Sequence, residues 1–345
     1  MQTEAAILVE TGKPLELVSL EIPALKPGQV FVEIAYSGAC GTQVMEAKGM
    51  KGEDKWLPHC MGHEGSATVL EVGSAVTKVV ADDQVILSWI RGSGQEAGGA
   101  NYLWDGKNVN AGGVTTFQRH AIVSENRLTK LMPGCPMDLA ILLGCAAPTG
   151  MGAVYNVLNV RPGQSCAIFG TGGIGLNACM AAALAGADPV IAIDPSDNRR
   201  DMAKKMGATH AIDPTAVDVG AAINEICPEG LDYAVEASGL SSVMGQALEC
   251  VRQQGGKAVV IGNAAHGEVL NLNPGSFNAG KSLMGTWGGD SMPDRDYARY
   301  AKLISNGRFA TRELLSRPYR LDEINDALND LSTGSVGRPL VDMSL

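Results

Sequence analysis

The sequence is poor in aromatic residues and has fewer basic than acidic side chains. Aromatic residues make up 5% of the chain, whereas it contains 43 glycines and 45% hydrophobic residues. This composition excludes an intrinsically disordered chain and indicates an interior of small aliphatic side chains with many tight turns. Lys and Arg total 27 against 37 Asp and Glu, for a formal net charge of −10. Such a surface repels phosphate backbones and anionic lipids, so we expect neither nucleic acid nor a membrane as a partner.

Closely spaced cysteines are also absent, because the eight cysteines are scattered singly and form no CxxC pair. This spacing argues against a disulfide framework and fits a reducing compartment, so any metal site must collect ligands from distant positions. The first residues lack the basic and apolar regions of a signal peptide, and we expect a cytoplasmic protein. Arg161 is the only charge between Leu139 and Ala187, but polar residues and glycines within this stretch favour a buried core over a membrane hairpin.

A chain of 345 residues is expected to form two domains. Residues 1 to about 135 contain short period-two segments separated by Gly and Pro, which predicts a β-rich domain. They are AAILVE, LELVSLE, QVFVEIAYSG, GSATVLEVG, QVILSW and HAIVSE. From Arg161 onward, short apolar strands alternate with helical segments, a pattern typical of βαβ units and a parallel sheet.

A glycine-rich turn follows the first strand of this second region. Gly170, Gly172 and Gly175 have G-x-G-x-x-G spacing between the strand SCAIF and a helix expected over 174–185. Glycines there let a pyrophosphate approach the amides at the helix N-terminus. The next strand ends at Asp194, 19 residues after Gly175, where a carboxylate can bind the adenosine ribose. The acid favours NAD over NADP, although Arg199 can reach the ribose edge; the alternative is a glycine-rich turn that binds nothing.

Three candidate metal ligands lie far apart in the sequence. Cys40 lies in SGACGTQ, His63 in MGHEG and Cys145 in LLGCAAPTG. A Cys/His/Cys set suits Zn²⁺ and leaves a fourth position open, as a catalytic site requires. Spacing alone leaves the alternative that each is a structural residue.

These segments give the chain a family resemblance. The CGT that begins at Cys40, GHEG, LGC followed by PTG, GTGGIG and the terminal SVGRPL occur in one order along the whole chain. In this order and spacing the chain resembles the zinc-dependent medium-chain alcohol dehydrogenases. The resemblance implies an α/β protein with a Rossmann doubly wound parallel sheet, binding NAD, over residues 148–287. It also implies a β-rich GroES-like catalytic domain made from residues 1–147 and 288–345.

The resemblance also implies roles for individual residues. Cys40, His63 and Cys145 match the catalytic zinc ligands, Glu64 matches an acid that can become a transient ligand, and Thr42 matches the hydroxyl that passes on the substrate proton. Residues matching the cofactor site are Thr149, Gly170, Gly172, Gly173, Ile174, Gly175, Asp194, Arg199, Ile261 and Arg338. Within this set Ile174 and Thr149 correspond to nicotinamide contacts, and Arg338 to a pyrophosphate contact. Trp89, and more weakly Trp56, are candidates for the substrate pocket.

Several positions depart from the family pattern. Ser88–Ile122 contains no cysteine, so we expect one catalytic zinc and no structural zinc. Gln43 replaces an acid that often supports the zinc ligands, Gly41 replaces a position that is often basic, and Met45 replaces a histidine that ends the proton relay in some relatives. We expect the relay to end in water. His59 and Cys60 are expected to serve local packing.

We therefore predict an NAD-dependent alcohol dehydrogenase that transfers hydride between NAD and an alcohol, with primary or aromatic alcohols favoured. Homodimers or homotetramers are usual in the family, and the segment SLMGTW is a candidate edge strand for assembly. Two alternatives stay open: a zinc-free NAD(P)H quinone or enone reductase of the same superfamily, and an NAD-binding protein without turnover.

Overall fold

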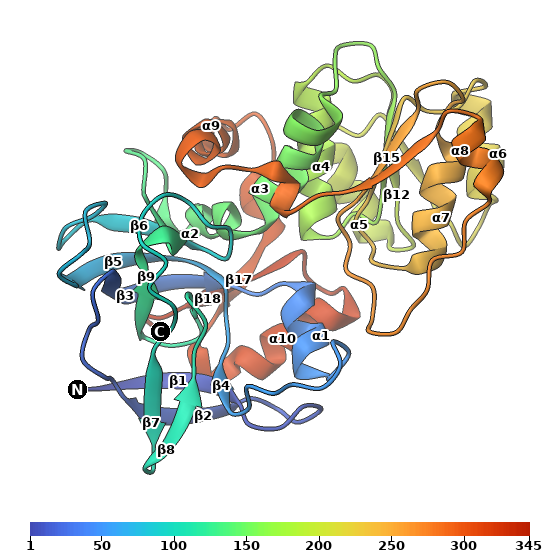
Figure 1. Cartoon of the computed structure of the whole chain (residues 1–345). Helices are drawn as coiled ribbons and strands as arrows, with labels where there is room; N and C mark the ends of the chain where they lie inside the picture. The colour runs from blue at the N-terminus through green and yellow to red at the C-terminus, as the bar shows by residue number, and fades with distance from the viewer. The chain divides into compact units, whose positions relative to one another are not determined.

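The computed structural model describes all residues 1–345 and contains two compact units (Figure 1). Unit 1 comprises Met1–Cys145, Met292–Asn306 and Leu315–Leu345, and unit 2 comprises Ala146–Ser291 and Gly307–Leu314. The expected division placed the whole tail from residue 288 in the catalytic domain. In the structure, residues 146–147, which were also expected in that domain, residues 288–291 and Gly307–Leu314 belong instead to unit 2.

Unit 1 contains a small closed barrel and a larger sheet. The barrel strands, in order, are β1 (Gln2–Leu8), β2 (Glu16–Glu21), β7 (Asn101–Trp104), β8 (Lys107–Asn110) and β4 (His59–Cys60). The sheet contains β10 (Leu128–Lys130), β6 (Gln84–Ser88), β5 (Glu64–Val72), β3 (Gln29–Gly38), β18 (Arg338–Asp342) and β17 (Leu315–Tyr319), and β9 (His120–Ser124) also pairs with β3. The helices are α1 (Gly41–Ala47), α2 (Met137–Ala140), α9 (Pro293–Ser305) and α10 (Ile324–Thr333).

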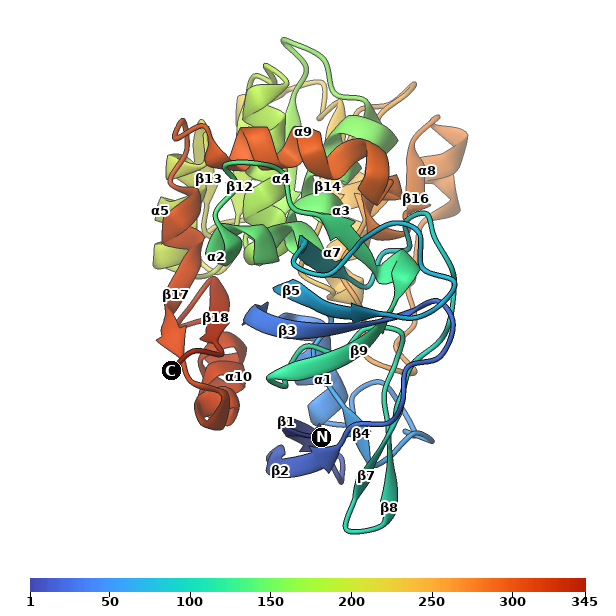
Figure 2. The ribbon, with the colours of Figure 1, turned by 90° about the vertical axis from the view of Figure 1, so that its left-hand side faces the viewer.

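Strand β3 is central to unit 1 because it pairs with β5, β9 and β18. Val30, Val32 and Ile34 alternate along it and are buried in one apolar core. Antiparallel pairing of Leu340 with Gly38 brings the end of the chain to the end of β3, and α10 lies beside β18 in Figure 2. The C-terminal tail therefore reaches the segment that contains Cys40.

All six strands expected in the first region are present. The structure adds a hairpin of β7 and β8 within the cysteine-free segment Ser88–Ile122, at positions where no strand was predicted. Its turn residues Asp105 and Gly106 have φ of 49° and 73°. Positive φ at both central positions is typical of a type I′ turn, for which Asp-Gly is a favoured sequence.

Unit 2 contains one sheet of six parallel strands. In spatial order they are β13 (His210–Ile212), β12 (Val190–Ile193), β11 (Cys166–Phe169), β14 (Tyr233–Glu236), β15 (Lys257–Val260) and β16 (Ser282–Gly285). The helices are α3 (Ala146–Gly152), α4 (Gly173–Leu184), α5 (Asp197–Lys205), α6 (Val219–Ile226), α7 (Ser241–Cys250) and α8 (Pro274–Asn278). The order 3-2-1-4-5-6 is that of the Rossmann fold, in which ligands bind where the order reverses, here between β11 and β14.

The remaining helical segments are short. They are 125–127, 141–144, 153–158, 288–290, 311–314 and 321–323. No single helix is long and apolar enough to cross a membrane; Met137–Gly144 and Ala146–Leu158 meet that test of length and composition only as a bent pair.

Close packing at the glycine-rich turn predicts a large effect of substitution at one glycine and a small effect at another. A Cβ at Gly175 would lie 1.9 Å from the Gly170 carbonyl oxygen, whereas a Cβ at Gly172 would meet no atom within 4 Å. We expect Gly175→Ala to lower the free energy of unfolding by about 2 kcal/mol or more, because α4 must move off the sheet. Gly172→Ala is the matched control and should change it by less than about 1 kcal/mol. Denaturant unfolding of both variants checks this, and equal effects would contradict it.

Candidate active site

The side chains of Cys40, His63 and Cys145 lie together in unit 1. Cys40 lies between β3 and α1, His63 directly precedes β5, and Cys145 follows the short helical turn 141–144. Cys40 Sγ is 3.2 Å from His63 Nε2, and the ligand atoms of all three residues lie within 4.8 Å of one another. Each cysteine is 4% exposed. The structure thus brings together the three residues that the sequence predicts as ligands.

The three groups strongly perturb one another. A hydrogen bond from the Cys145 thiol, opposed by burial, lowers the pKa of Cys40 well below its ordinary value. The same hydrogen bond, together with burial, raises the pKa of Cys145 well above its ordinary value. Burial would lower the pKa of His63, but the negative charge on Cys40 raises it. The pKa values of Cys40, Cys145 and His63 are therefore linked through one hydrogen bond and through the charges of the neighbouring groups.

A buried ion pair adjoins the cluster. The Arg338 guanidinium donates to Glu64 Oε1 at 2.8 Å and to the Ala39 carbonyl at 3.0 Å. Glu64 Oε2 and Arg338 Nε have no hydrogen-bond partner. Burial would lower the pKa of Arg338, but the Glu64 carboxylate raises it, so the guanidinium stays charged.

Glycines make room for the Glu64 side chain. A Cβ at Gly38 would lie 2.8 Å from Glu64 Cδ, and a Cβ at Gly144 would lie 2.6 Å from Glu64 Cβ. The acid therefore occupies a close-fitting cradle formed by the end of β3 and the turn before Cys145.

Hydrogen bonds fix the segments that carry the ligands. Gln43 Oε1 accepts from the Cys40 amide at 3.0 Å. The Ser88 hydroxyl donates to the Gly144 carbonyl at 2.8 Å and lies 2.7 Å from the Tyr297 hydroxyl. These contacts hold the backbone at Cys40 and just before Cys145, and neither Ser88 nor Tyr297 was predicted to support the site.

Gly62 directly precedes His63 and fixes the backbone that carries this ligand. Its φ is +88°, and a Cβ there would lie 2.3 Å from Thr116 Oγ1. The glycine that begins GHEG is thus required both for its left-handed backbone and for close packing.

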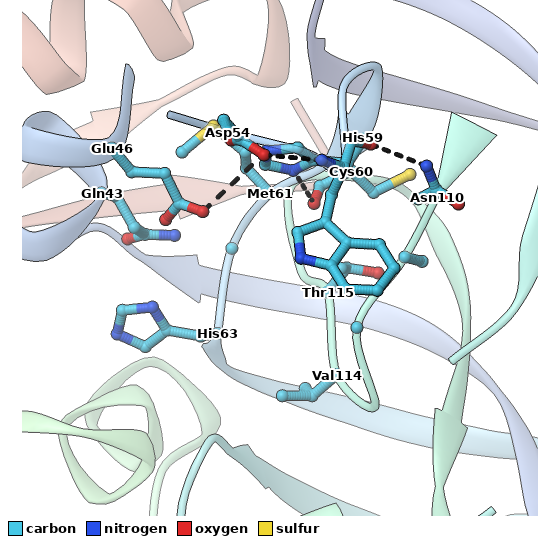
Figure 3. Close-up of a pocket in the computed structure, with 14 residues that line it drawn as sticks. Gln43, Glu46, Asp54, His59, Cys60, Met61, His63, Asn110, Val114 and Thr115 are labelled. Atoms are coloured by element: carbon cyan, nitrogen blue, oxygen red, sulfur yellow. Dashed lines mark hydrogen bonds and ion pairs between the residues drawn. The ribbon is translucent and has the colours of Figure 1, made fainter. Parts of the chain in front are cut away.

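A pocket of about 360 Å³ lies beside His63 within unit 1 (Figure 3). The residues that line it are Gln43, Glu46, Asp54, Trp56, His59, Cys60, Met61, Gly62, His63, Asn110, Ala111, Gly112, Val114 and Thr115. Trp56 is in this lining, whereas Trp89, the stronger sequence candidate, is half-buried at the end of β6 and is not. Thr42 lies in the first turn of α1, next to Gln43.

Sequence reasoning missed Glu46 and Asp54 and assigned His59 to packing only. His59 Nε2 is 2.9 Å from Asp54 Oδ2 and 3.9 Å from Glu46 Oε1, and its Nδ1 is 3.0 Å from the Cys60 carbonyl oxygen. Burial would raise the pKa of Asp54, but hydrogen bonds from the Trp56 amide and from His59 lower it. One signal was available, since Glu46 follows Thr42 by four residues in the helix and shares its face.

The glycine-rich turn of unit 2 has the geometry of a dinucleotide site. Gly170 has a φ of +87°, Gly172 is open to an approaching ligand, and Gly175 lets α4 pack against the end of β11. Asp194 is 2% exposed and accepts from the Thr171 amide at 2.8 Å and from the Ser196 amide at 2.9 Å. The carboxylate is therefore fixed beside the turn.

The remaining predicted cofactor residues lie in both units. In unit 2, Arg199 Nη1 is 3.8 Å from Asp194 Oδ2, Gly173 and Ile174 form the first turn of α4, and Ile261 directly follows β15. Thr149 is buried in α3, where a Cβ at the neighbouring Gly150 would lie 2.3 Å from the Ile174 carbonyl oxygen. Arg338 lies in unit 1, paired with Glu64 and 2% exposed.

Comparisons with known proteins agree with this architecture. Residues 26–133 match the family model of the alcohol dehydrogenase GroES-like domain, and residues 173–306 match that of the zinc-binding dehydrogenases. The sequence is 31% identical to an S-(hydroxymethyl)glutathione dehydrogenase of Synechocystis, in an alignment that covers 99% of this chain and 100% of the relative. With the same coverage it is 30% identical to an alcohol dehydrogenase class-3 of Cereibacter sphaeroides.

Two solved structures share the fold over 99% of both chains. An alcohol dehydrogenase zinc-binding domain protein from Burkholderia ambifaria superposes with a TM-score of 0.92 at 30% identity. A benzyl alcohol dehydrogenase from Acinetobacter calcoaceticus superposes with a TM-score of 0.90 at 28% identity. Taken with the cluster of two cysteines and a histidine and with the Rossmann sheet, these matches show that the chain belongs to the zinc-dependent medium-chain alcohol dehydrogenase family.

Proposed function

We propose that the protein oxidises an alcohol with NAD, giving an aldehyde or ketone, NADH and a proton, and catalyses the reverse reaction. The observation that carries this proposal is the convergence of Cys40, His63 and Cys145 within 4.8 Å. Their order along the chain and the family membership point to one catalytic zinc.

The donor set fits zinc. Two thiol sulfurs and an imidazole nitrogen are ligands that Zn²⁺ prefers, and three protein ligands leave a position for substrate. Arg338 already pairs with Glu64. The two buried cysteine sulfurs in thiolate form would therefore be difficult to stabilise without a further cation. The unpartnered Glu64 Oε2 adds an oxygen that can act as the transient ligand implied by the family resemblance.

Zinc, when bound, would supply a Lewis acid to the alcohol oxygen, and NAD would accept the hydride. Cys40, His63 and Cys145 would hold the ion, with the Cys40 amide fixed by Gln43. Arg338 offsets the charge of Glu64 and keeps the buried cluster from accumulating negative charge. Thr42, in the first turn of α1, is proposed to relay the proton: its hydroxyl oxygen accepts the proton of the alcohol hydroxyl as it gives its own proton toward solvent.

The proposal includes NAD as the cofactor. The open backbone at Gly172 and the N-terminus of α4 favour a pyrophosphate, as a phosphate binds well at free helix amides. The fixed carboxylate of Asp194 can accept from a ribose hydroxyl and would repel a 2′-phosphate. Ile174, Thr149, Ile261 and Arg338 are proposed as further cofactor contacts.

We also propose a preference for primary or aromatic alcohols, which the likeness to the benzyl alcohol dehydrogenase structure supports. A homodimer or homotetramer and a cytoplasmic location are part of the same proposal. Strand β16 forms an edge of the unit 2 sheet, and its free edge is the candidate for pairing between subunits.

Replacing one ligand tests the metal site. Cys145→Ser should lower the zinc content from about one ion per chain to less than about 0.1 and abolish NAD-linked alcohol oxidation, since loss of one of three protein ligands weakens the site severely. Elemental analysis and a screen of alcohols monitored by NADH absorbance measure both effects.

Cys227→Ser is the matched control, because Cys227 lies in unit 2, away from the cluster, and should keep both zinc and activity. A wild-type protein without stoichiometric zinc would favour the quinone or enone reductase. Zinc present without any hydride transfer would favour the NAD-binding protein without turnover.

Asp194→Asn tests the choice of cofactor. Removal of the carboxylate charge should lower the ratio of kcat/KM for NAD over that for NADP by about tenfold or more, because the 2′-phosphate is no longer repelled. Asp197→Asn, an exposed acid three residues away, is the control and should leave the ratio within about twofold. An unchanged ratio in Asp194→Asn would exclude this carboxylate as the discriminating group.

A further inference from the structure

The pocket beside His63 is polar on the side formed by α1 and by the chain that leads to β4. Gln43, Glu46, Asp54 and His59 contribute amide, carboxylate and imidazole groups to its lining (Figure 3). Its volume of about 360 Å³ is within the range of about 300–1,000 Å³ for small-molecule sites. Because His63 is a proposed zinc ligand, this pocket is a place for the part of the substrate that surrounds the reacting carbon.

Gln43, which is part of the pocket lining, has an unsatisfied side-chain donor. Its Oε1 is engaged by the Cys40 amide, which fixes the orientation of the side-chain amide. Its Nε2 has no hydrogen-bond partner, although the residue is only 1% exposed. An unpaired buried donor is unfavourable, so a ligand that supplies an acceptor to this group is stabilised by the hydrogen bond.

Among the charged groups next to Gln43, the Glu46 carboxylate is the acceptor that stays available for further hydrogen bonds. Both ring nitrogens of His59 already have partners, because Nε2 lies 2.9 Å from Asp54 Oδ2 and Nδ1 lies 3.0 Å from the Cys60 carbonyl oxygen. Asp54 is also engaged by the Trp56 amide at 2.9 Å. Glu46, with 31% of its side chain exposed, has only the 3.9 Å ion pair with His59 and can accept further hydrogen bonds.

Gln43 and Glu46 therefore form a donor and acceptor pair. They are three residues apart in α1, which puts them on one face of the helix, and both side chains line the same pocket (Figure 3). A hydroxyl is the uncharged group that accepts from one and donates to the other. An ammonium group has no acceptor for Gln43, a carboxylate is repelled by Glu46, and a hydrocarbon leaves Gln43 unpaired.

An exposed tryptophan supplies an apolar surface in the same lining. The Trp56 side chain is 70% exposed, yet its backbone is held by Asp54 Oδ1 and by Asn110 Nδ2, which donates to the Trp56 carbonyl at 2.7 Å. The C–H face of a polyhydroxylated chain can pack against an indole ring while its hydroxyls reach the polar groups.

We propose that the substrate is a polyhydroxylated alcohol, in which a hydroxyl near the reacting carbon accepts from Gln43 Nε2 and donates to the Glu46 carboxylate. This inference rests on the proposed alcohol oxidation and narrows its substrate class: among primary alcohols, one that carries further hydroxyls is preferred to a monohydric alcohol of the same length.

A matched pair of four-carbon alcohols tests the proposal. For the zinc-loaded wild-type protein, kcat/KM for erythritol should exceed that for butan-1-ol by about tenfold or more, because a site that binds a hydroxyl leaves its polar groups unpaired with the analogue that lacks it. Glu46→Ala should lower this ratio by about tenfold. Glu53→Ala removes an exposed acid of the same loop that is outside the pocket lining and should leave the ratio within about twofold.

Gln43→Glu gives a second variant, which keeps an oxygen for the Cys40 amide but removes the donor, and it should also lower the ratio. Calorimetric binding of both alcohols to the zinc-loaded protein gives a readout that does not depend on turnover. The inference is supported if erythritol binds more tightly than butan-1-ol and if Glu46→Ala weakens the binding of erythritol. This holds even if no hydride is transferred to NAD, because that result would refute the proposed function alone. Equal or weaker binding of erythritol, or a ratio that Glu46→Ala leaves unchanged, overturns the inference, whether or not butan-1-ol is oxidised.

Discussion

Two cysteines, a histidine and a carboxylate share one buried region of unit 1, and the electrostatics of this cluster constrain the surrounding structure. The Cys40 and Cys145 sulfurs are close enough to share a hydrogen bond, which lowers the pKa of Cys40 and raises the pKa of Cys145 in a region almost closed to water. Arg338 compensates for Glu64 through an ion pair that is almost wholly buried. Several structural features support this arrangement: the return of the chain terminus along β18, the cradle formed by Gly38 and Gly144, and the hydrogen bond from the Cys40 amide to Gln43 Oε1.

In unit 2, the glycine-rich turn and Asp194 provide the features that a dinucleotide site needs. A dinucleotide phosphate needs free amides and room for close approach, and both depend on the absence of side chains at Gly170 and Gly172. The parallel order of the sheet puts this turn at the point where the strand order reverses. Asp194 then contributes a fixed carboxylate whose two oxygens are each anchored by a backbone amide, at Thr171 and Ser196.

Local patterns in the sequence were sufficient for the parallel sheet, since most of its strands are short apolar runs and α4, α5 and α7 begin within a few residues of the strands that precede them. The helix expected over 174–185 is observed over Gly173–Leu184. The metal cluster was predictable only through the family resemblance, because no spacing rule connects Cys40 with Cys145. The polar pocket was not predicted: His59 meets Asp54 and Glu46 through the path of the chain between α1 and β4, and no periodic pattern encodes that path. The β7–β8 hairpin was missed although Asp105–Gly106 is a recognisable turn.

Two sulfurs and one imidazole nitrogen are expected to hold a single zinc ion, and X-ray absorption at the zinc edge of the purified protein measures these ligands. We expect two sulfur ligands at about 2.3 Å and nitrogen or oxygen ligands at about 2.0–2.1 Å. A first shell of four sulfurs, or one made only of nitrogen and oxygen, would contradict it.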